Sequence, residues 1–488
     1  GNSIGLPKFH TVDENGRFIP DLKGIGGMYV KSKEAEEKII AALKEKNALF
    51  APPKPYRHDY PFCWRCGKPL LYYARKSWWV RVSKFRKELL RNNDAVRWVP
   101  GHTGTGRFKE FLREARDWAF SRERYWGTPL PIWKCGTCAR VEVIGSIAEL
   151  KKAVKNLPCD EDGDVNLHRP YVDGISFPCG KKCRGTMTRV PEVADVWFDS
   201  GAMPFAQASL PFFQKTEKGT YRTIDISTYR NINISAYQNS GMPYPADFIC
   251  EAVDQTRGWF YTLLVVATLL GKKSPYKNVI SLGHVLDKNG QKMSKSKGNV
   301  VDPNTLMQKY GADALRWYFY TVNSAGEPKR FNENDVQKKL SGFLNTLWNS
   351  FSLFDIYVNT IQNKQKNPAS KHVLDRWIMI RLGQVVDEVT GRLDEYDVTS
   401  AAHALEYFVV NDFSQWYVRR SRQRFQRPET KEEKETVAEV TAHVLLGLCK
   451  LTAPFAPFLS EEIYQKLKTK MRLKEASVHC AEWPNRVS

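Results

Sequence analysis

Residues 247–286 contain the feature that most restricts the fold of this chain. Two apolar runs, 247–252 and 279–286, have the length and composition of buried β-strands, and a helical run lies between them from Arg257 to Leu270. Strand, helix and strand in this order form the unit from which parallel sheets are built. The sequence therefore predicts an α/β domain. Another short strand is predicted at 194–198, and the polar segment 213–244 is expected to be an insertion or a long loop.

A glycine-bounded loop follows the second of these strands. Residues 290–298 read Gly-Gln-Lys-Met-Ser-Lys-Ser-Lys-Gly and come directly after a turn at 287–290. Loops at the carboxyl ends of strands are where α/β sheets bind nucleotides. Lys292 and Lys295 are suited to stabilise the negative charge that develops on a departing pyrophosphate. The alternative is a solvated basic loop without a ligand.

Paired cysteines indicate a metal site. The chain has the pairs Cys63/Cys66, 135/138 and 179/183, and such spacing is typical of thiolate ligation. Cys63 and Cys66 form only half a site. The other two pairs complete a four-thiolate set, so we predict an inserted zinc ribbon at about 134–189 with a structural Zn²⁺ bound by Cys135, Cys138, Cys179 and Cys183.

The charge of the chain indicates a polyanionic partner. Its 488 residues carry a formal net charge of +21, and 65–124 is the most basic broad stretch, with tyrosines and tryptophans among the cations. Charge mixed with aromatic side chains is expected where nucleic acid is held. The alternative is a basic surface over an aromatic core. The longest apolar run, 260–270, is too short for a membrane span, so we expect a cytoplasmic protein.

Helical periodicity dominates after about residue 335. Helices are predicted at about 374–393, 398–425 and 431–451, and a fourth begins near Ser460. The second of these helices carries a cluster of arginines without an acid among residues 419–427, and such a face can meet phosphates. The alternative is a solvated helix that pairs with Glu432 and Glu433. The predicted nucleic-acid-binding residues are Arg419, Arg420, Arg422 and Arg424, with Arg427 beside them.

Several short sequence motifs of the chain resemble those of one enzyme family. Lys-Met-Ser-Lys-Ser at 292–296 is similar to the signature loop of class I aminoacyl-tRNA synthetases. The words at 191–201 and 247–260 look like the isoleucine-specific family, whereas valine and leucine relatives carry different words there. Those at 121–129 and 412–421 resemble the same family in its eukaryotic and archaeal style. The resemblance extends from about residue 5 to 470.

The resemblance implies a role for each matching residue. Lys292 and Lys295 would stabilise the transition state of adenylation, with Mg²⁺ bound to ATP, and His284 would touch adenine or be structural. Carboxylates suit an ammonium group and ribose hydroxyls, because both are donors. The implied contacts to the isoleucyl-adenylate are Glu251, Asp254 and Gln255, with Trp197 and Trp259 as walls of the side-chain pocket.

Two departures from the family pattern stand out. The His-x-Gly-His word that holds ATP phosphates is not found, and Gly101-His102-Thr103-Gly104 does not have that form. Ala252 stands where the family usually has Gly beside the adenylate.

The expected organisation is a trailing end of the editing domain (1–57), the second half of a Rossmann-type catalytic domain (58–334) and an α-helical anticodon-binding bundle (335–488).

The sequence is expected to be the C-terminal part of an isoleucine–tRNA ligase, without the half that carries the His-x-Gly-His motif. Its predicted partners are ATP, isoleucine, isoleucine tRNA and the absent N-terminal half, and we expect a monomer that is inactive alone. A non-catalytic tRNA-binding module is the alternative from another class, favoured by the absent His-x-Gly-His word and disfavoured by Lys292–Ser296 and Glu251. Valine specificity is a closer alternative, which the residues around Trp259 disfavour.

Overall fold

The structure is a computed structural model that describes residues 9–54, 56, 58–63, 66–72, 75–161, 163–180, 183–207, 213–215, 221–223, 244–294, 298–361 and 370–485. The chain divides after Trp79 into two compact units, which are described separately. Among the described residues, no helix combines the length and apolar character that a bilayer crossing needs.

Among its described residues, the first unit contains one α-helix, α1 (Lys33–Glu45). The Ser32 hydroxyl accepts a hydrogen bond from the Ala35 amide at 3.3 Å and so satisfies one of the free donors of the first turn. The helix ends before Asn47, whose φ of 50° is left-handed.

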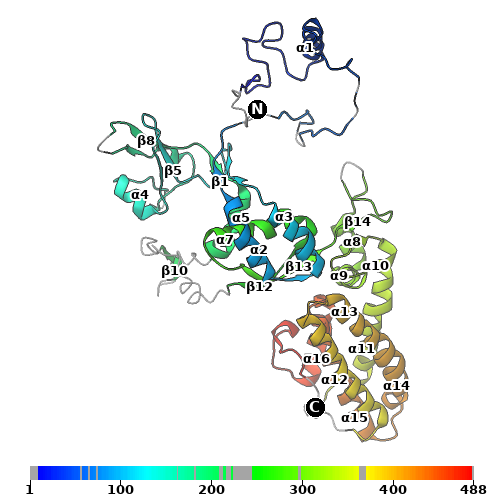
Figure 1. Ribbon diagram of the computed structural model, residues 1–488. Helices are drawn as coiled ribbons and strands as arrows, with labels where there is room; N and C mark the ends of the chain where they lie inside the picture. The colour runs from blue at the N-terminus through cyan, green and yellow to red at the C-terminus, as the bar shows by residue number, and fades with distance from the viewer. Residues whose placement is uncertain are drawn as a thin grey trace. The chain divides into compact units, whose positions relative to one another are not determined.

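The second unit contains the predicted parallel sheet. Its strand order is β12 (Ala246–Ala252), β13 (Tyr276–Leu282), β2 (Arg97–Val99), and both pairings are parallel. Helix α7 (Trp259–Leu269) connects β12 to β13, which confirms the strand–helix–strand unit. Helices α2 (Arg86–Asp94) and α5 (Val196–Ala206) pack against α7, and α3 (Lys109–Arg113) packs against α2. Figure 1 shows these helices around the sheet.

The predicted strand at 194–198 is largely wrong. Strand β9 comprises only Val193–Ala194 and pairs antiparallel with β4 (Ser121–Arg122). Helix α5 begins two residues later, because the carboxylate of Asp195 accepts a hydrogen bond from the Trp197 amide at 3.2 Å. This N-cap ends the extended backbone and starts the helix.

Two of the three cysteine pairs, 135/138 and 179/183, lie at one end of a small antiparallel sheet. The strand order is β6 (Val141–Val143), β5 (Ile132–Cys135), β8 (Thr186–Arg189), β7 (Ser176–Pro178), and helix α4 (Ile147–Ala153) follows β6. Buried Trp133 and Met187 belong to its separate hydrophobic core. In the segment 213–244, β10 (Phe213–Lys215) pairs antiparallel with β11 (Tyr221–Thr223), and residues 216–220 and 224–243 lie outside the described residues.

The C-terminal region is helical, as predicted. A large core extends from Leu306 to Val478 and also includes residues of helices before residue 335. The domain boundaries proposed from the sequence stay predictions. The elements are β14 (Val285–Leu286), β15 (Lys329–Arg330), α8 (Pro303–Tyr310), α9 (Ala312–Thr321), α10 (Glu333–Lys339), α11 (Asn345–Tyr357), α12 (Val373–Asp394), α13 (Val398–Tyr407), α14 (Arg419–Gln426), α15 (Lys431–Thr452) and α16 (Pro457–Met471). A π-helical segment, Phe408–Val418, joins α13 to α14.

Candidate active site and metal centre

The carboxyl end of β12 presents the acidic residues that the sequence singles out. Glu251 lies on the strand and Asp254 lies in the 3₁₀ turn Val253–Arg257 that follows it, and both are exposed. Ala252 is paired in register with Leu282 of β13, so His284 lies two residues beyond the same end of the sheet. His284 is also exposed. Parallel strands therefore bring Asp254 and His284 to one edge, where α/β sheets bind nucleotides.

Gln255 holds the start of α7. Its Oε1 accepts a hydrogen bond from the Trp259 amide at 2.8 Å, and its Nε2 donates to Asp254 Oδ2 at 3.1 Å. A Cβ at Gly258 would lie 2.4 Å from Gln255 Oε1 and 3.1 Å from the Trp197 ring, so a larger residue there would displace the Gln255 side chain from its bond to the Trp259 amide. Gln255 thus uses its side-chain amide to support the turn, whereas the family resemblance implies that this amide contacts the adenylate.

The two predicted pocket tryptophans lie on neighbouring helices. The Trp259 indole Nε1 donates to the Ser200 carbonyl at 3.3 Å, which joins α7 to α5. Trp197 is 41% exposed at the start of α5, and its ring approaches Gly258. The structure therefore gathers Trp197, Gln255 and Trp259 where both helices begin.

Asp195 is a positioning residue that the sequence analysis missed. Its buried carboxylate caps α5 at the Trp197 amide and also accepts hydrogen bonds from Trp118 Nε1 at 2.9 Å and Arg122 Nη2 at 2.6 Å. Three donors around one carboxylate fix the first turn of α5, and hence Trp197. The sequence signal was an Asp directly before an apolar helical run, which is a typical N-cap.

The lysine loop is described up to Ser294 and again from Gly298. Lys292 is exposed and its backbone pairs antiparallel with Leu286, whereas Lys295 lies outside the described residues. Gly290 has a φ of +77°, which lets the chain reverse between the two limbs. Met293 packs against the helical core. The loop is therefore anchored on a strand and on the helices.

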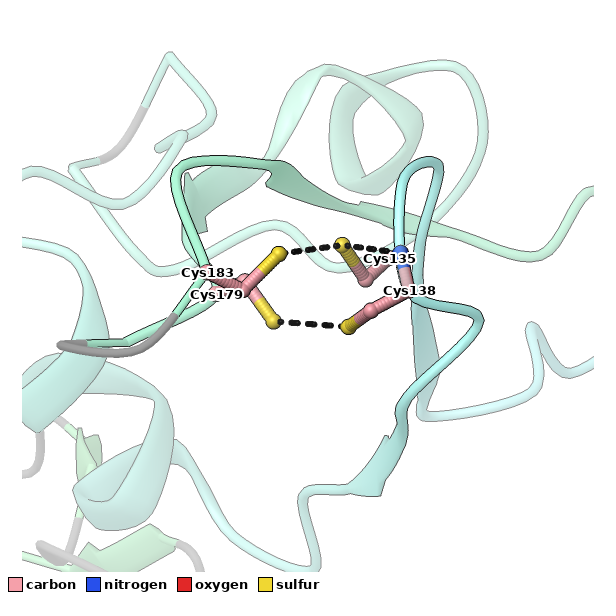
Figure 2. Close-up of side chains that lie close together, drawn as sticks. All are labelled: Cys135, Cys138, Cys179 and Cys183. Carbon is pink, nitrogen blue, oxygen red and sulfur yellow. Dashed lines mark hydrogen bonds between the residues drawn. The ribbon is translucent and has the colours of Figure 1, made fainter.

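Four cysteine sulfurs face one another at one end of the small antiparallel sheet (Figure 2), where Cys135 ends β5, Cys179 follows β7 and Cys183 precedes β8. Cys135 Sγ lies 3.8 Å from Cys183 Sγ, Cys138 Sγ lies 3.5 Å from Cys179 Sγ, and all four lie within 4.8 Å of one another. Sulfurs at tetrahedral positions about 2.3 Å from a metal would be about 3.8 Å apart. In the part of the chain that the structure describes, they are the one cluster of at least three His, Cys, Asp or Glu side chains that could hold a metal ion.

Backbone amides surround the first cysteine of this cluster. The amides of Thr137 and Cys138 point at Cys135 Sγ from 3.4 and 3.5 Å. Hydrogen bonds from the Cys138 and Thr137 amides lower the pKa of Cys135 to about 6. Burial and the neighbouring thiols raise the pKa of Cys179 to about 12. Metal binding requires deprotonated thiols, so the amides that stabilise the Cys135 thiolate favour ligation of a cation at this cluster.

The arginine cluster of α14 is divided by burial. Arg419, Arg420 and Arg422 are exposed, and the Arg420 guanidinium lies 3.8 Å from the centre of the Trp416 ring. A stacked cation on an exposed ring is a surface that nucleic-acid bases and phosphates can contact.

Arg424 departs from the prediction and does not belong to that surface. It is buried, and its Nη1 and Nη2 donate to the two carboxylate oxygens of Asp375 at 2.7 and 2.8 Å, while Nε lies 3.3 Å from Glu433 Oε1. Although burial acts to raise it, the pKa of Asp375 is held below its usual value by Arg424, Ser370 and Tyr417. The guanidinium is used inside the bundle. Of the alternative of a solvated helix that pairs with Glu432 and Glu433, only the contact with Glu433 applies to this residue, because it is buried.

Comparison with known proteins identifies the family. The family model described as tRNA synthetases class I (I, L, M and V) matches residues 22–331, which is more than half of the chain. The chain belongs to this family. A second model, the anticodon-binding domain of tRNA ligase, matches residues 375–488 and covers α12 to α16 of this class I synthetase.

Curated relatives are similar over nearly the whole chain. An isoleucine–tRNA ligase of Clostridium novyi is 45% identical, over 99% of this chain and 44% of the relative. One of Thermus thermophilus is 43% identical, over 98% of this chain and 43% of the relative. The chain therefore spans less than half the length of these relatives.

Solved structures share the fold. A LeuRS–tRNA–LeuAMS complex from Agrobacterium radiobacter is 22% identical, with a TM-score of 0.53 over 76% of this chain and 42% of that one. A methionyl-tRNA synthetase of Mycobacterium tuberculosis in complex with methionyl-adenylate is 18% identical, with a TM-score of 0.55 over 83% of this chain and 65% of that one. They support a class I catalytic domain followed by a helical anticodon-binding region.

Proposed function

We propose that the protein acts as an isoleucine–tRNA ligase. The carrying observation is the 45% identity to an isoleucine–tRNA ligase, which extends over 99% of the chain, so the matched span covers the segments that hold the strand-end acids and the lysine loop. In the proposed reaction, the isoleucine carboxylate attacks the α-phosphate of ATP and pyrophosphate leaves. A ribose hydroxyl of tRNA then attacks the acyl carbon, and AMP leaves.

The exposed strand-end residues are proposed to bind the adenylate. Glu251 accepts hydrogen bonds from the ammonium group of isoleucine, and Asp254 accepts hydrogen bonds from ribose hydroxyls. Both side chains are exposed at the end of β12, so neither is already committed to the core. Trp197 and Trp259 are proposed to border the isoleucine side chain. Gln255 holds the Trp259 amide, the Ser200 carbonyl holds the Trp259 indole, and Asp195 holds the Trp197 amide.

The lysines of the signature loop are proposed to act on pyrophosphate. Lys292 and Lys295 donate hydrogen bonds to phosphate oxygens as negative charge builds on the leaving group, and Mg²⁺ accompanies ATP. His284 is proposed to contact adenine from the same sheet edge. The sequence contains no His-x-Gly-His word for the triphosphate. In this proposal a further polypeptide segment, such as the part of the relatives that this chain does not match, supplies those contacts.

The four-cysteine cluster is proposed to bind Zn²⁺. All four groups are thiols, their sulfur spacing fits a tetrahedral ion, and a closed four-thiolate set is the structural type of zinc site. The ion would stabilise the sheet of β5 to β8 as an inserted ribbon. Cys135, Cys138, Cys179 and Cys183 would be its ligands.

The helical region is proposed to bind the isoleucine tRNA. Exposed Arg419, Arg420 and Arg422 support this, with Trp416 beneath Arg420, and the net charge of +21 favours a polyanion. We further propose that the protein is a cytoplasmic monomer.

The test of the function is amino-acid-dependent exchange of pyrophosphate into ATP. The assay uses this chain joined to, or mixed with, the N-terminal segment that a related isoleucine enzyme carries. Exchange should depend on isoleucine and fall by orders of magnitude with Glu251→Gln. Exchange driven equally by valine would redirect the assignment. Binding of tRNA without any exchange would favour the non-catalytic module.

A further inference from the structure

The base of the lysine loop is closed by two side chains from opposite sides of the signature. Asn299 follows the loop, and its Nδ2 donates to Asp287 Oδ2 at 2.9 Å before the loop. The same Nδ2 donates to the Lys292 carbonyl at 3.3 Å, and Asn299 Oδ1 accepts from the Ser294 amide at 2.9 Å. One amide group thus contacts three points on the other limb.

Asp287 organises the limb that Asn299 contacts. Its Oδ1 accepts hydrogen bonds from the amides of Asn289 at 2.9 Å and Gln291 at 2.8 Å, and its own amide donates to the Gln291 carbonyl at 2.9 Å. One oxygen of the carboxylate therefore holds the turn, and the other holds Asn299. A charged acceptor makes each of these bonds stronger than a neutral one would.

Both sides of this contact rest on fixed structure. Before Asp287, strand β14 pairs with β15, and the Phe331 amide donates to the Leu286 carbonyl at 2.8 Å. After Asn299, Asp302 caps α8 by accepting from the amides of Asn304 and Thr305 at 3.1 and 3.3 Å. Only two residues separate Asn299 from that cap. The pair therefore links a strand end to a helix start.

We propose that Asp287 and Asn299 form a bracket that sets the backbone position of Lys292, so that both are positioning residues for the activation step. This proposal rests on the proposed ligase function. Lys292 is held by the bridge to Leu286 on one side and by the bond to Asn299 on the other. A lysine ammonium sits on a flexible four-carbon stem, so a fixed backbone reduces the conformational freedom lost when it meets phosphate.

The chemistry of the bracket allows a donor–acceptor exchange. Asn299→Asp keeps the acceptor for Ser294 but removes both donors and places two carboxylates about 3 Å apart, which is repulsive. Asp287→Asn leaves two amide donors facing each other. The double substitution Asp287→Asn with Asn299→Asp restores one donor and one acceptor across the bracket. It does not restore the bond to the Lys292 carbonyl, so recovery should be partial.

The test measures isoleucine-dependent pyrophosphate exchange in this chain joined to, or mixed with, the N-terminal segment of a related isoleucine enzyme. Asn299→Asp should lower kcat by about tenfold or more, as expected for lost bonds to a charged group, with little change in the KM for isoleucine. The double variant should regain at least about threefold of that loss. Asn289→Asp is the matched control, because it adds the same charge to an exposed side chain of the same turn and should stay within about twofold.

A second measurement is independent of catalysis. Amide hydrogen exchange on the chain alone should become faster at residues 287–294 in each single variant and recover in the double variant, while α12 is unchanged as an internal reference. Unchanged exchange in Asn299→Asp, or a double variant no better than the single ones, would overturn the bracket. Protein without isoleucine-dependent activity but with the expected amide protection would instead refute only the proposed function.

Discussion

The strand-end site and the arginine helix use polar side chains in opposite ways. At the end of β12 and in the loop, Glu251, Asp254 and Lys292 are exposed, and neighbouring groups hold the backbone that carries them. On α14, the cationic side chains look alike in sequence, yet Arg424 is buried and ion-paired whereas Arg420 lies on an exposed ring. At the strand end and in the loop, the residues that the motifs single out are exposed, whereas the arginines of a helical cluster must be sorted by burial.

The largest expected effect concerns the completeness of the strand-end site. This chain alone should show no isoleucine-dependent pyrophosphate exchange, because Lys292 and Lys295 can meet ATP from only one side. Positioning of reactants is worth roughly 7–11 kcal/mol, so the loss should be near total. Exchange should appear when the N-terminal segment of a related enzyme is supplied. Activity of the chain alone that vanishes with Lys295→Ala would contradict this prediction.

The second prediction tests whether the cysteine cluster binds a metal ion, independently of the strand-end site and of the arginine helix. Elemental analysis should find one Zn²⁺ per chain, and Cys179→Ser should abolish it, because a four-thiolate site loses a ligand. Loss of the ion should loosen β5 to β8 and leave the helical bundle folded, since the sheet has its own core. Cys449→Ser is a control, because this buried cysteine lies on α15 and should leave the metal content unchanged. Purified protein without metal would refute the site.

The third prediction concerns the buried arginine. Arg424→Ala should lower the free energy of unfolding by about 3–5 kcal/mol, because Asp375 would be left as an uncompensated buried charge. The exposed neighbour Arg422→Ala should change it by less than about 0.5 kcal/mol. Denaturant unfolding of the two variants measures the difference. Equal effects would mean that burial does not separate the two residues.

The same ion pair predicts a dependence of stability on pH. The pKa of Asp375 is lowered in the folded protein, so the unfolded state takes up the proton first as the pH falls. The contribution of the pair is present above the unfolded pKa of about 3.9 and is lost as the pH falls through the lower folded value. Between about pH 5 and pH 2, the free energy of unfolding of the parent protein should therefore fall more steeply with decreasing pH than that of Asp375→Asn.

Much of the fold follows from the sequence because its periodicity is local. The strands around α7 and the helices at 373–394 and 431–452 were predictable from apolar spacing. The start of α5 was not, because one side chain, Asp195, ends an apparently continuous strand pattern. Local composition does not show whether the residues around Asp195 continue as a strand or begin a helix, because that depends on the side-chain hydrogen bond that caps the helix.

The contents of the site divide in the same way. Residues that match motif words could be named from the sequence, although their roles stay predictions. Asn299 and Asp287 were not identified as a pair, because their contact spans the loop and depends on where two distant elements place its ends. The burial of Arg424 depends on Asp375, 49 residues earlier, and no helical spacing indicates that contact.

The smallest expected effect concerns the exposed arginines and is read from salt dependence. The logarithm of the tRNA affinity should fall linearly with the logarithm of the salt concentration, because each neutralised phosphate releases counterions. Arg419→Ala and Arg420→Ala should each reduce the slope by about 0.7–0.9, the value for one phosphate contact. Lys431→Ala is the matched control, since it removes one charge from a largely exposed side chain at the start of the adjacent helix α15. Filter binding at several salt concentrations measures the slopes. A control slope that falls as much as the arginine slopes would assign binding to net charge, and unchanged arginine slopes would mean that this face of α14 meets only solvent.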